Sequence, residues 1–306
     1  MSTINVSNLA GPSSTGTAAI LASVNGGSIA GSRNRIINGG AAVDQRNAGA
    51  AQTFTAAAAL AYSVDRWYGY CTGANVTGQQ IAGATAGQFR YRFTGAASVT
   101  AIGFGHRIEQ LNSADLASST ATLSVDLANS LLTTVTWSAY YATTADTFGT
   151  LASPTRTQIA TGTFTVTSTV TRYSTNISVS AAATTGIEIV FTVGAQISGT
   201  WTIGNVQLEP GTVATPFERR CYGQELALCQ RYYYRIGPGM NIHGFTYPPA
   251  GLQIADVYHK QTMRTTPTIT QALGTGSISS VNATPEKTAL VGTSFFVSDF
   301  TASAEL

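Results

Sequence analysis

Aromatic side chains gather in three short clusters, and their types and spacing give the strongest chemical signal in this sequence. The clusters are Trp67-Tyr68-Gly69-Tyr70, Trp137 with Tyr140-Tyr141, and Tyr232-Tyr233-Tyr234. A flat aromatic ring packs against the C–H face of a sugar ring, while neighbouring amide and carboxylate groups bind the sugar hydroxyls. The sequence therefore predicts a carbohydrate site with Trp137 or Tyr140 as its stacking platform. Glu109 and Gln110, in a neighbouring segment, are the expected hydroxyl partners.

The spacing within a cluster limits how many of its rings can reach such a site. Successive side chains of a β-strand point to opposite faces of the sheet. Trp137 and Tyr140 are three residues apart, so a regular strand places them on opposite faces and only one of them belongs to the site. By the same rule, at least one ring of each cluster belongs to the core.

Sequence patterns typical of enzymes and metal sites are absent. The chain has no G-x-S-x-G nucleophile turn, no H-E-x-x-H zinc pair, no G-x-x-x-x-G-K-[ST] phosphate loop and no G-x-G-x-x-G motif. Cys221 and Cys229 are separated too widely for the close spacing of zinc ligands. We therefore expect no catalytic residue, no metal and no cofactor. A carboxylate pair such as Glu109 and Asp115, which a glycosidase would need, stays open because nothing in the spacing selects one pair.

The chain is poor in charge. Only 10% of its 306 residues are charged, against a usual figure of about 25%. The net charge of +2 is too small to indicate nucleic-acid binding. Because such a surface has marginal solubility on its own, we expect much of it to be buried against copies of itself or against another protein. No apolar run approaches the roughly 18 residues of a membrane span, so no membrane insertion is expected.

From residue 52 to 212 the dominant sequence period is two, which is typical of β-strands. Residues 161–171 alternate threonine with other residues throughout. Many short strands without amphipathic helices between them predict an all-β jelly-roll sandwich. The best helical segment lies within 216–231, and β character returns over 232–306. Two apolar rows are expected to point inward, Leu123, Val125 and Leu127 on one strand and Ile187, Ile189 and Phe191 on another.

These patterns divide the chain into three parts. Residues 1–50 are expected to form an N-terminal arm and collar. Within them, residues 1–32 carry only scattered apolar side chains, so ordering this stretch requires a partner surface. Residues 51–215 form the jelly-roll β-sandwich, and residues 216–306 form a smaller C-terminal β domain.

Several strings, in this order, resemble those of bacteriophage tail fibre and tail appendage proteins. The segment Asn34–Gly39, followed by Val43–Arg46, is similar to the motif that precedes the jelly roll in that group. The remaining strings resemble the carbohydrate-binding-module-like jelly roll and C-terminal domain of the same group: Tyr62–Trp67, Arg107–Gln110 with Asp115-Leu116, Gly204–Gly211 with Thr215–Arg220, Tyr222–Tyr233, Met263–Thr268 and Ala304–Leu306.

The resemblance covers nearly the whole chain. It implies a virion protein that forms a homotrimer and binds host surface glycans without catalytic residues. The three cysteines and the lack of a secretory signal favour production in a reducing cytoplasm, which would be that of the bacterial host. The N-terminal arm would serve attachment to other virion proteins and trimerisation. A purely structural virion component, such as an adaptor or capsid decoration protein, is the alternative. A polysaccharide-degrading spike is a third possibility.

Overall fold

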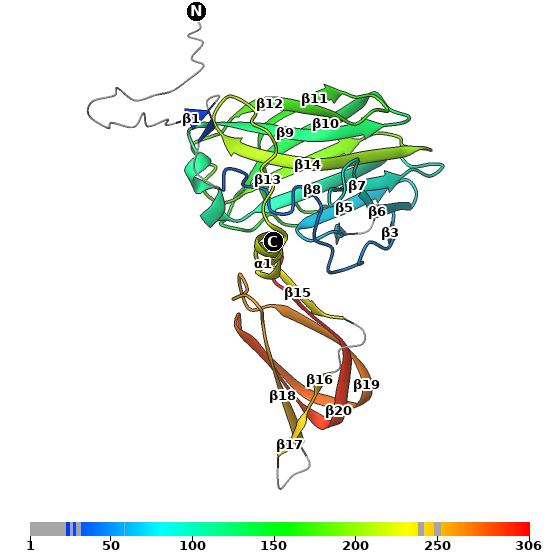
Figure 1. Cartoon of the computed structure of the whole chain (residues 1–306), viewed down its shortest axis with the longest axis vertical. Coiled ribbons are helices and arrows are strands. Elements are labelled where there is room, and N and C mark those ends of the chain that lie inside the picture. Colours follow the sequence, from blue (N-terminus) through cyan, green and yellow to red (C-terminus); the bar gives the residue numbers. More distant parts are fainter. Residues whose placement is uncertain (1–22, 25–26, 29–31, 58, 238–241, 248–251) are drawn as a thin grey trace, which may run out of the picture.

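The computed structural model describes residues 23–24, 27–28, 32–57, 59–237, 242–247 and 252–306, which form two β units joined by a helix (Figure 1). The larger unit is a sandwich of two six-stranded antiparallel sheets, so the expected all-β jelly-roll sandwich is confirmed. Most of the expected arm over residues 1–32 lies outside the described residues. Within it the structure describes the short hairpin of β1 (Ser23–Val24) and β2 (Gly27–Ser28).

Both sheets of the sandwich mix strands that are distant in the sequence. In spatial order, the first sheet consists of β11 (Arg156–Thr165), β10 (Thr134–Ala142), β13 (Ile187–Val193), β8 (Ala101–Ile108), β5 (Trp67–Thr72) and β4 (Ala61–Tyr62). The second consists, also in spatial order, of β12 (Thr171–Ser178), β9 (Thr120–Asn129), β14 (Thr200–Pro210), β7 (Phe89–Thr94), β6 (Val76–Ala82) and β3 (Gln52–Phe54). Two short 3₁₀ turns, η1 (Gln110–Asn112) and η2 (Ala114–Leu116), follow β8.

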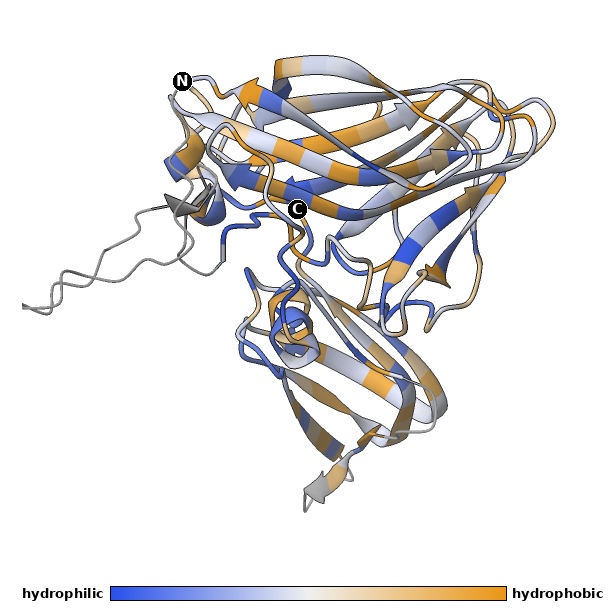
Figure 2. Cartoon of the chain, turned by 45° about the horizontal axis from the view of Figure 1, so that its top comes forward, coloured by the Kyte–Doolittle hydropathy of each residue, from blue (hydrophilic) through white to orange (hydrophobic). Residues whose placement is uncertain are grey.

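The inner faces of the two sheets supply one continuous hydrophobic core. Both apolar rows predicted from the period of two point inward, on β9 and on β13, and every member of each row is at most 1% exposed. Aromatic rings fill the space between the sheets, with Trp67 stacked on Phe104 at 4.8 Å between ring centroids. The alternation of hydrophobic and hydrophilic residues along the strands is visible in Figure 2. Burial of one face of each sheet therefore fixes the register of the sandwich.

Residues 32–50 pack against the sandwich in an irregular path. The Arg35 amide donates to the Leu208 carbonyl (2.8 Å), and the Val206 amide donates to the Gly39 carbonyl (2.9 Å). A Cβ at Gly39 would overlap the Val206 carbonyl oxygen, so this close approach requires glycine. Val43 is fully buried. This part of the predicted collar is thus tied to β14.

The smaller unit follows helix α1 (Tyr222–Gln230), which lies within the predicted helical segment. Its sheet is built around the long strand β20 (Lys287–Ser303), whose Phe300 is fully buried in a separate core. Five further strands complete it: β15 (Tyr233–Ile236), β16 (Ile242–His243), β17 (Phe245–Tyr247), β18 (Leu252–Tyr258) and β19 (Thr268–Ala283).

A buried charge network joins the two units. Glu305, just after β20, reaches back to the sandwich, where its carboxylate pairs with Arg66 and, at 2.9 Å, with Arg46. The two guanidinium groups each lie 3.5 Å from the centroid of a tyrosine ring, Arg66 over Tyr232 and Arg46 over Tyr233. The Arg66 and Glu305 side chains are 1% and 5% exposed. We call these five residues the junction network.

The last residue of the chain also contacts the sandwich. The backbone oxygen of Leu306 accepts hydrogen bonds from Arg107 (2.6 Å) and from the Tyr62 hydroxyl (2.9 Å). Close to the network, burial raises the pKa of the Asp65 carboxyl to about 6, while Arg46 opposes that shift. The contact between the units therefore combines buried charges with a small apolar cluster of Ile37, Val43, Cys229 and Tyr232, and it is largely closed to water.

Candidate functional site

Two tyrosine rings lie flat on the outer face of the first sheet. Tyr68 and Tyr70 of β5 stand opposite Gly105 and Gly103 of β8 in the antiparallel register. A Cβ at either glycine would overlap the tyrosine ring opposite it. The absence of side chains at these two positions therefore lets both rings pack directly on the β8 backbone.

Glu188 of β13 lies at the centre of this face and is fully buried. Its Oε1 accepts hydrogen bonds from the Tyr68 hydroxyl (2.6 Å) and from Nε of Arg107 (2.7 Å), and its other oxygen pairs with Arg156. Burial raises the pKa of Tyr68, although Arg107 and Arg156 oppose the shift, so Tyr68 is a neutral donor to this carboxylate. The carboxyl group of Glu188 is thus held between two guanidinium groups.

Tyr140 of β10 completes the face, opposite Glu188 in the register. The Arg156 guanidinium lies 4.1 Å from the centroid of the Tyr140 ring. Tyr70 and Tyr140 are both half-buried, so part of each ring remains open to solvent. Burial raises the pKa of Tyr70, and the nearby Arg156 opposes that shift. We call Tyr68, Tyr70, Tyr140, Arg156 and Glu188 the tyrosine face.

Such an arrangement offers groups that can bind a ligand with both apolar and polar surfaces. Partly open rings offer apolar faces, and the Arg156 guanidinium offers donors in a fixed orientation. Both oxygens of Glu188 are engaged by guanidinium groups, so this side chain fixes the positions of Arg107 and Arg156.

Trp137 is not the exposed stacking platform that the sequence predicts. It is 5% exposed and belongs to the sandwich core, with its ring against Gly162 and 6.5 Å from Phe164. The reason is the face on which it falls, since Val135 and Ala139 share its side of β10 and are also buried. The prediction that Trp137 and Tyr140 lie on opposite faces is consistent with this arrangement, and Tyr140 is the outer one.

Glu109 is not available as a sugar partner. It is 4% exposed and accepts hydrogen bonds from Arg231 (2.8 Å) and the Tyr232 hydroxyl (2.8 Å), where the helix meets the sandwich. Gln110 begins η1, and its backbone amide donates to Asp146 (2.7 Å) in the loop after β10. The structure therefore does not bring Glu109 and Gln110 together with Tyr140 as one binding site.

Arg156 and Glu188 are functional candidates that the sequence patterns do not single out, and Tyr70 belongs to the first aromatic cluster without being predicted as a site residue. The sequence does hold a signal for Tyr70. In Tyr68-Gly69-Tyr70 the large side chains are at the outer two positions, whereas in Gly103-Phe104-Gly105 the outer two positions are glycines, so the two segments fit together when paired. The pairing of those strands is needed before the complementarity can be recognised. Arg156 and Glu188 have no comparable local pattern.

The remaining reactive side chains are dispersed. Cys71 and Cys229 are buried free thiols, whereas Cys221 is exposed, and the part of the chain that the structure describes has no cluster of three metal-binding side chains. His106 is buried and hydrogen-bonded to the Ile37 carbonyl (3.0 Å), and burial lowers its pKa. Across the same described ranges, no helix is long and apolar enough to cross a membrane.

No protein-family model and no curated protein matches this chain. Among solved structures it is similar to TmCBM61 in complex with β-1,4-galactotriose, with a TM-score of 0.37 and 12% identity over 58% of this chain and 99% of that one. It is also similar to the enzymatically active domain of tailspike protein 4 of bacteriophage CBA120, with a TM-score of 0.35 and 17% identity. That match covers 58% of this chain and 21% of the tailspike chain. A family 11 carbohydrate-binding module of Clostridium thermocellum gives a TM-score of 0.33 and 12% identity over 51% of this chain and 97% of that one.

Proposed function

We propose that this chain is a structural protein of a bacteriophage virion, a tail fibre or short tail appendage, whose tyrosine face binds carbohydrate on the host surface. The observation that carries the binding proposal is the pair of rings laid over Gly103 and Gly105 beside the Tyr140–Arg156 stack. The assignment to a virion is supported by the resemblance of the sequence strings to tail proteins.

The proposed role is binding without catalysis. A sugar ring placed on the face would pack against Tyr70 and Tyr140, while Arg156 donates to a hydroxyl or ring oxygen. Tyr68 and Glu188 lie beneath this contact and hold Arg156 in place. Fixed rings and a fixed guanidinium reduce the ordering cost of binding.

Tyr140→Ala and Tyr70→Ala are each expected to weaken glycan binding by roughly 1–3 kcal/mol, a range borrowed from base–aromatic stacking. A glycan array carrying host polysaccharides identifies the ligand, and titration of each variant then measures the change in affinity.

Ile197→Ala is the control for these substitutions. Ile197 is 52% exposed in the segment between β13 and β14, and it belongs neither to the tyrosine face nor to the proposed contact between copies, so its loss should leave affinity unchanged. If the wild-type protein binds no host glycan, the alternative of a purely structural virion component takes the place of the binding proposal. That alternative is favoured by the burial of most of the aromatic rings.

We further propose that the protein is a homotrimer in which the smaller unit contributes to the contact between copies. The 16 residues of β19 carry no charge, and among the described strands β19 pairs only with β20. Edge strands of soluble proteins are usually protected by charged side chains. Six large apolar side chains of this unit are exposed, namely Phe245, Leu252, Ile254, Tyr258, Leu273 and Val281.

A double variant, Leu273→Lys with Val281→Lys, is expected to dissociate the trimer. In the trimer these lysines would be buried in the contact between copies, close to the same lysines of the neighbouring copies. They would lose their hydration and repel one another. Light scattering at micromolar concentration measures the mass. Leu131→Lys, at a similarly exposed position of the sandwich, should leave the mass unchanged. A stable, soluble wild-type monomer would rule out the trimer.

A further inference from the structure

A pocket of about 380 Å³ opens on the sandwich next to the start of helix α1, separate from the tyrosine face. Five segments distant in sequence converge on it: the loop 38–42, the turn and strand start at 87–89, Asn205 of β14, the linker 217–220 and the first turn of α1. Its volume lies in the range of small-molecule sites. Convergence of so many segments gives the pocket fixed walls.

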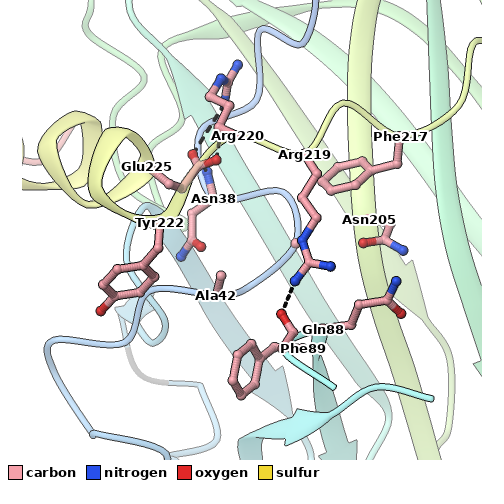
Figure 3. Close-up of a pocket in the computed structure, with 12 residues that line it drawn as sticks. Asn38, Ala42, Gln88, Phe89, Asn205, Phe217, Arg219, Arg220, Tyr222 and Glu225 are labelled. Carbon is pink, nitrogen blue, oxygen red and sulfur yellow. Dashed lines mark hydrogen bonds and ion pairs between the residues drawn. The ribbon is translucent and has the colours of Figure 1, made fainter. Parts of the chain in front are cut away.

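Three aromatic rings line the pocket from different sides. Figure 3 shows Phe217 and Tyr222 on opposite sides and Phe89 below them. Tyr222 is 62% exposed although it is large and aromatic. Gly40 and Ala42 line the space between the rings, where Arg219 is the one long side chain that Figure 3 shows crossing it. The rings therefore form an open apolar cradle suited to a flat or saturated six-membered ring.

The charge in the pocket is positive and uncompensated. Arg220 and Glu225 pair with each other at 3.2 Å, and Glu225 also accepts the Asn38 backbone amide (2.6 Å). Arg219 is exposed, donates one hydrogen bond to the Gly87 carbonyl, and has no ion-pair partner among the described residues. Figure 3 shows it reaching across the pocket from the linker. Its remaining N–H groups can bind an anion.

Two amide side chains lie close to the same space. The Asn205 amide nitrogen donates to Asp126 (2.8 Å), which fixes the side chain and leaves its oxygen 3.8 Å from where a Cβ on Gly40 would stand. The Gln88 side chain makes no hydrogen bond to any residue that the structure describes. Both amides can bind hydroxyl groups of a ligand held between the rings.

We infer that this pocket binds a sugar that bears a carboxylate, such as a hexuronate residue of an acidic polysaccharide. The sugar ring packs between the aromatic rings, the carboxylate binds the Arg219 guanidinium, and the hydroxyls bind Asn205 and Gln88. Arginine suits this role because its planar donors match the two oxygens of a carboxylate. The pocket thus adds a second, acid-selective site to the sandwich, independent of the tyrosine face.

The test uses three probes on the full chain: methyl β-glucuronide, methyl β-glucoside and acetate. Titrations followed by calorimetry or by NMR shifts give the affinities. The glucuronide is expected to bind most tightly, because it alone has both the ring and the carboxylate. Acetate binding as tight as the glucuronide would reduce the pocket to an unspecific anion site and overturn the inference.

Arg219→Gln is expected to weaken glucuronide binding at least tenfold and to leave the weaker glucoside binding unchanged. Arg92→Gln is the matched control, since Arg92 does not line the pocket and forms no ion pair with a described residue. Ala42→Phe, which fills the space between the rings, should abolish binding of both sugars. Unchanged glucuronide affinity in Arg219→Gln would overturn the inference.

Tyr140→Ala separates this inference from the proposed function. That variant should retain full glucuronide affinity at the pocket, whatever the array shows for the tyrosine face. If Tyr140→Ala loses glucuronide binding while Arg219→Gln retains it, the acidic ligand binds at the tyrosine face and the inference about the pocket is refuted.

Discussion

Replacing Glu305 with alanine is expected to lower the free energy of unfolding by about 3–5 kcal/mol. The substitution leaves Arg66 as a buried cation with no carboxylate partner, because its side chain is 1% exposed and its one ion pair in the described chain is with Glu305. Arg46 keeps only Asp65, at 3.7 Å. Urea unfolding followed by tryptophan fluorescence measures the loss. All three tryptophans lie in the sandwich, and Trp67 directly follows Arg66 in the sequence.

The matched control is Asp256→Ala. Asp256 pairs with Lys287 at 3.2 Å on the surface of the smaller unit, where the two side chains are 36% and 42% exposed. Exposed pairs of this kind contribute about 0–1 kcal/mol, so little loss is expected. An equal, small loss in both variants would mean that water reaches the junction network and that its charges are not buried.

Leu123→Ala is expected to cost about 2–5 kcal/mol, the range for removing a fully buried leucine side chain. Leu123 is 0% exposed on β9 and lies between two neighbouring strands, opposite Leu208 of β14 and Thr175 of β12. The rigid sheets on either side limit how far the cavity can collapse. Calorimetry or urea unfolding of the variant measures the loss.

Leu131→Ala provides the same chemical change on the surface. Leu131 follows β9 in the next turn and is 41% exposed, so its loss should change stability by no more than about 0.5 kcal/mol. A Leu123→Ala variant as stable as the Leu131→Ala variant would contradict the burial of the β9 row.

The sandwich could be predicted from the sequence because its governing pattern is local. In β9 and β13 the alternation of side chains follows from strand geometry alone, so the inward rows can be identified without any partner strand. The helix before β15 could be located for a similar reason, since its residues are contiguous. Such predictions require only that one face of each element be buried.

The sequence left Trp137 and Tyr140 open as the stacking platform, and the burial of Trp137 leaves Tyr140 as the outer ring. The neighbours of Trp137 at alternate positions, Val135 and Ala139, are apolar, whereas Tyr140 shares its face with Thr136 and Ser138. A tryptophan on the apolar side enters the core because burying so large a ring is strongly favourable. The flanking residues therefore carried the information that the aromatic type alone did not.

The junction network and the pocket had no such local signal. Glu305 meets Arg66 across 239 positions of sequence, and Arg219 meets Gly87 across 132. No periodicity connects residues so far apart. Their proximity follows from the pairing of whole sheets and from the return of the chain after β20.

That return has a mechanical consequence. The smaller unit is held to the sandwich in two ways, through the chain between β14 and α1 and through noncovalent contacts, which include those of Glu305 and Leu306 and those of Arg231 and Tyr232 with Glu109. Both attachments lie at the same end of the unit, where Figure 1 places the helix and the end of the chain. A force that pulls the two units apart along the long axis of the molecule acts on the chain connection and on the noncovalent contacts at the same time. The connecting segment therefore cannot extend until the charged contacts rupture. We therefore expect the junction between the two units to be stiff under load, and its noncovalent contacts to rupture together in a single step.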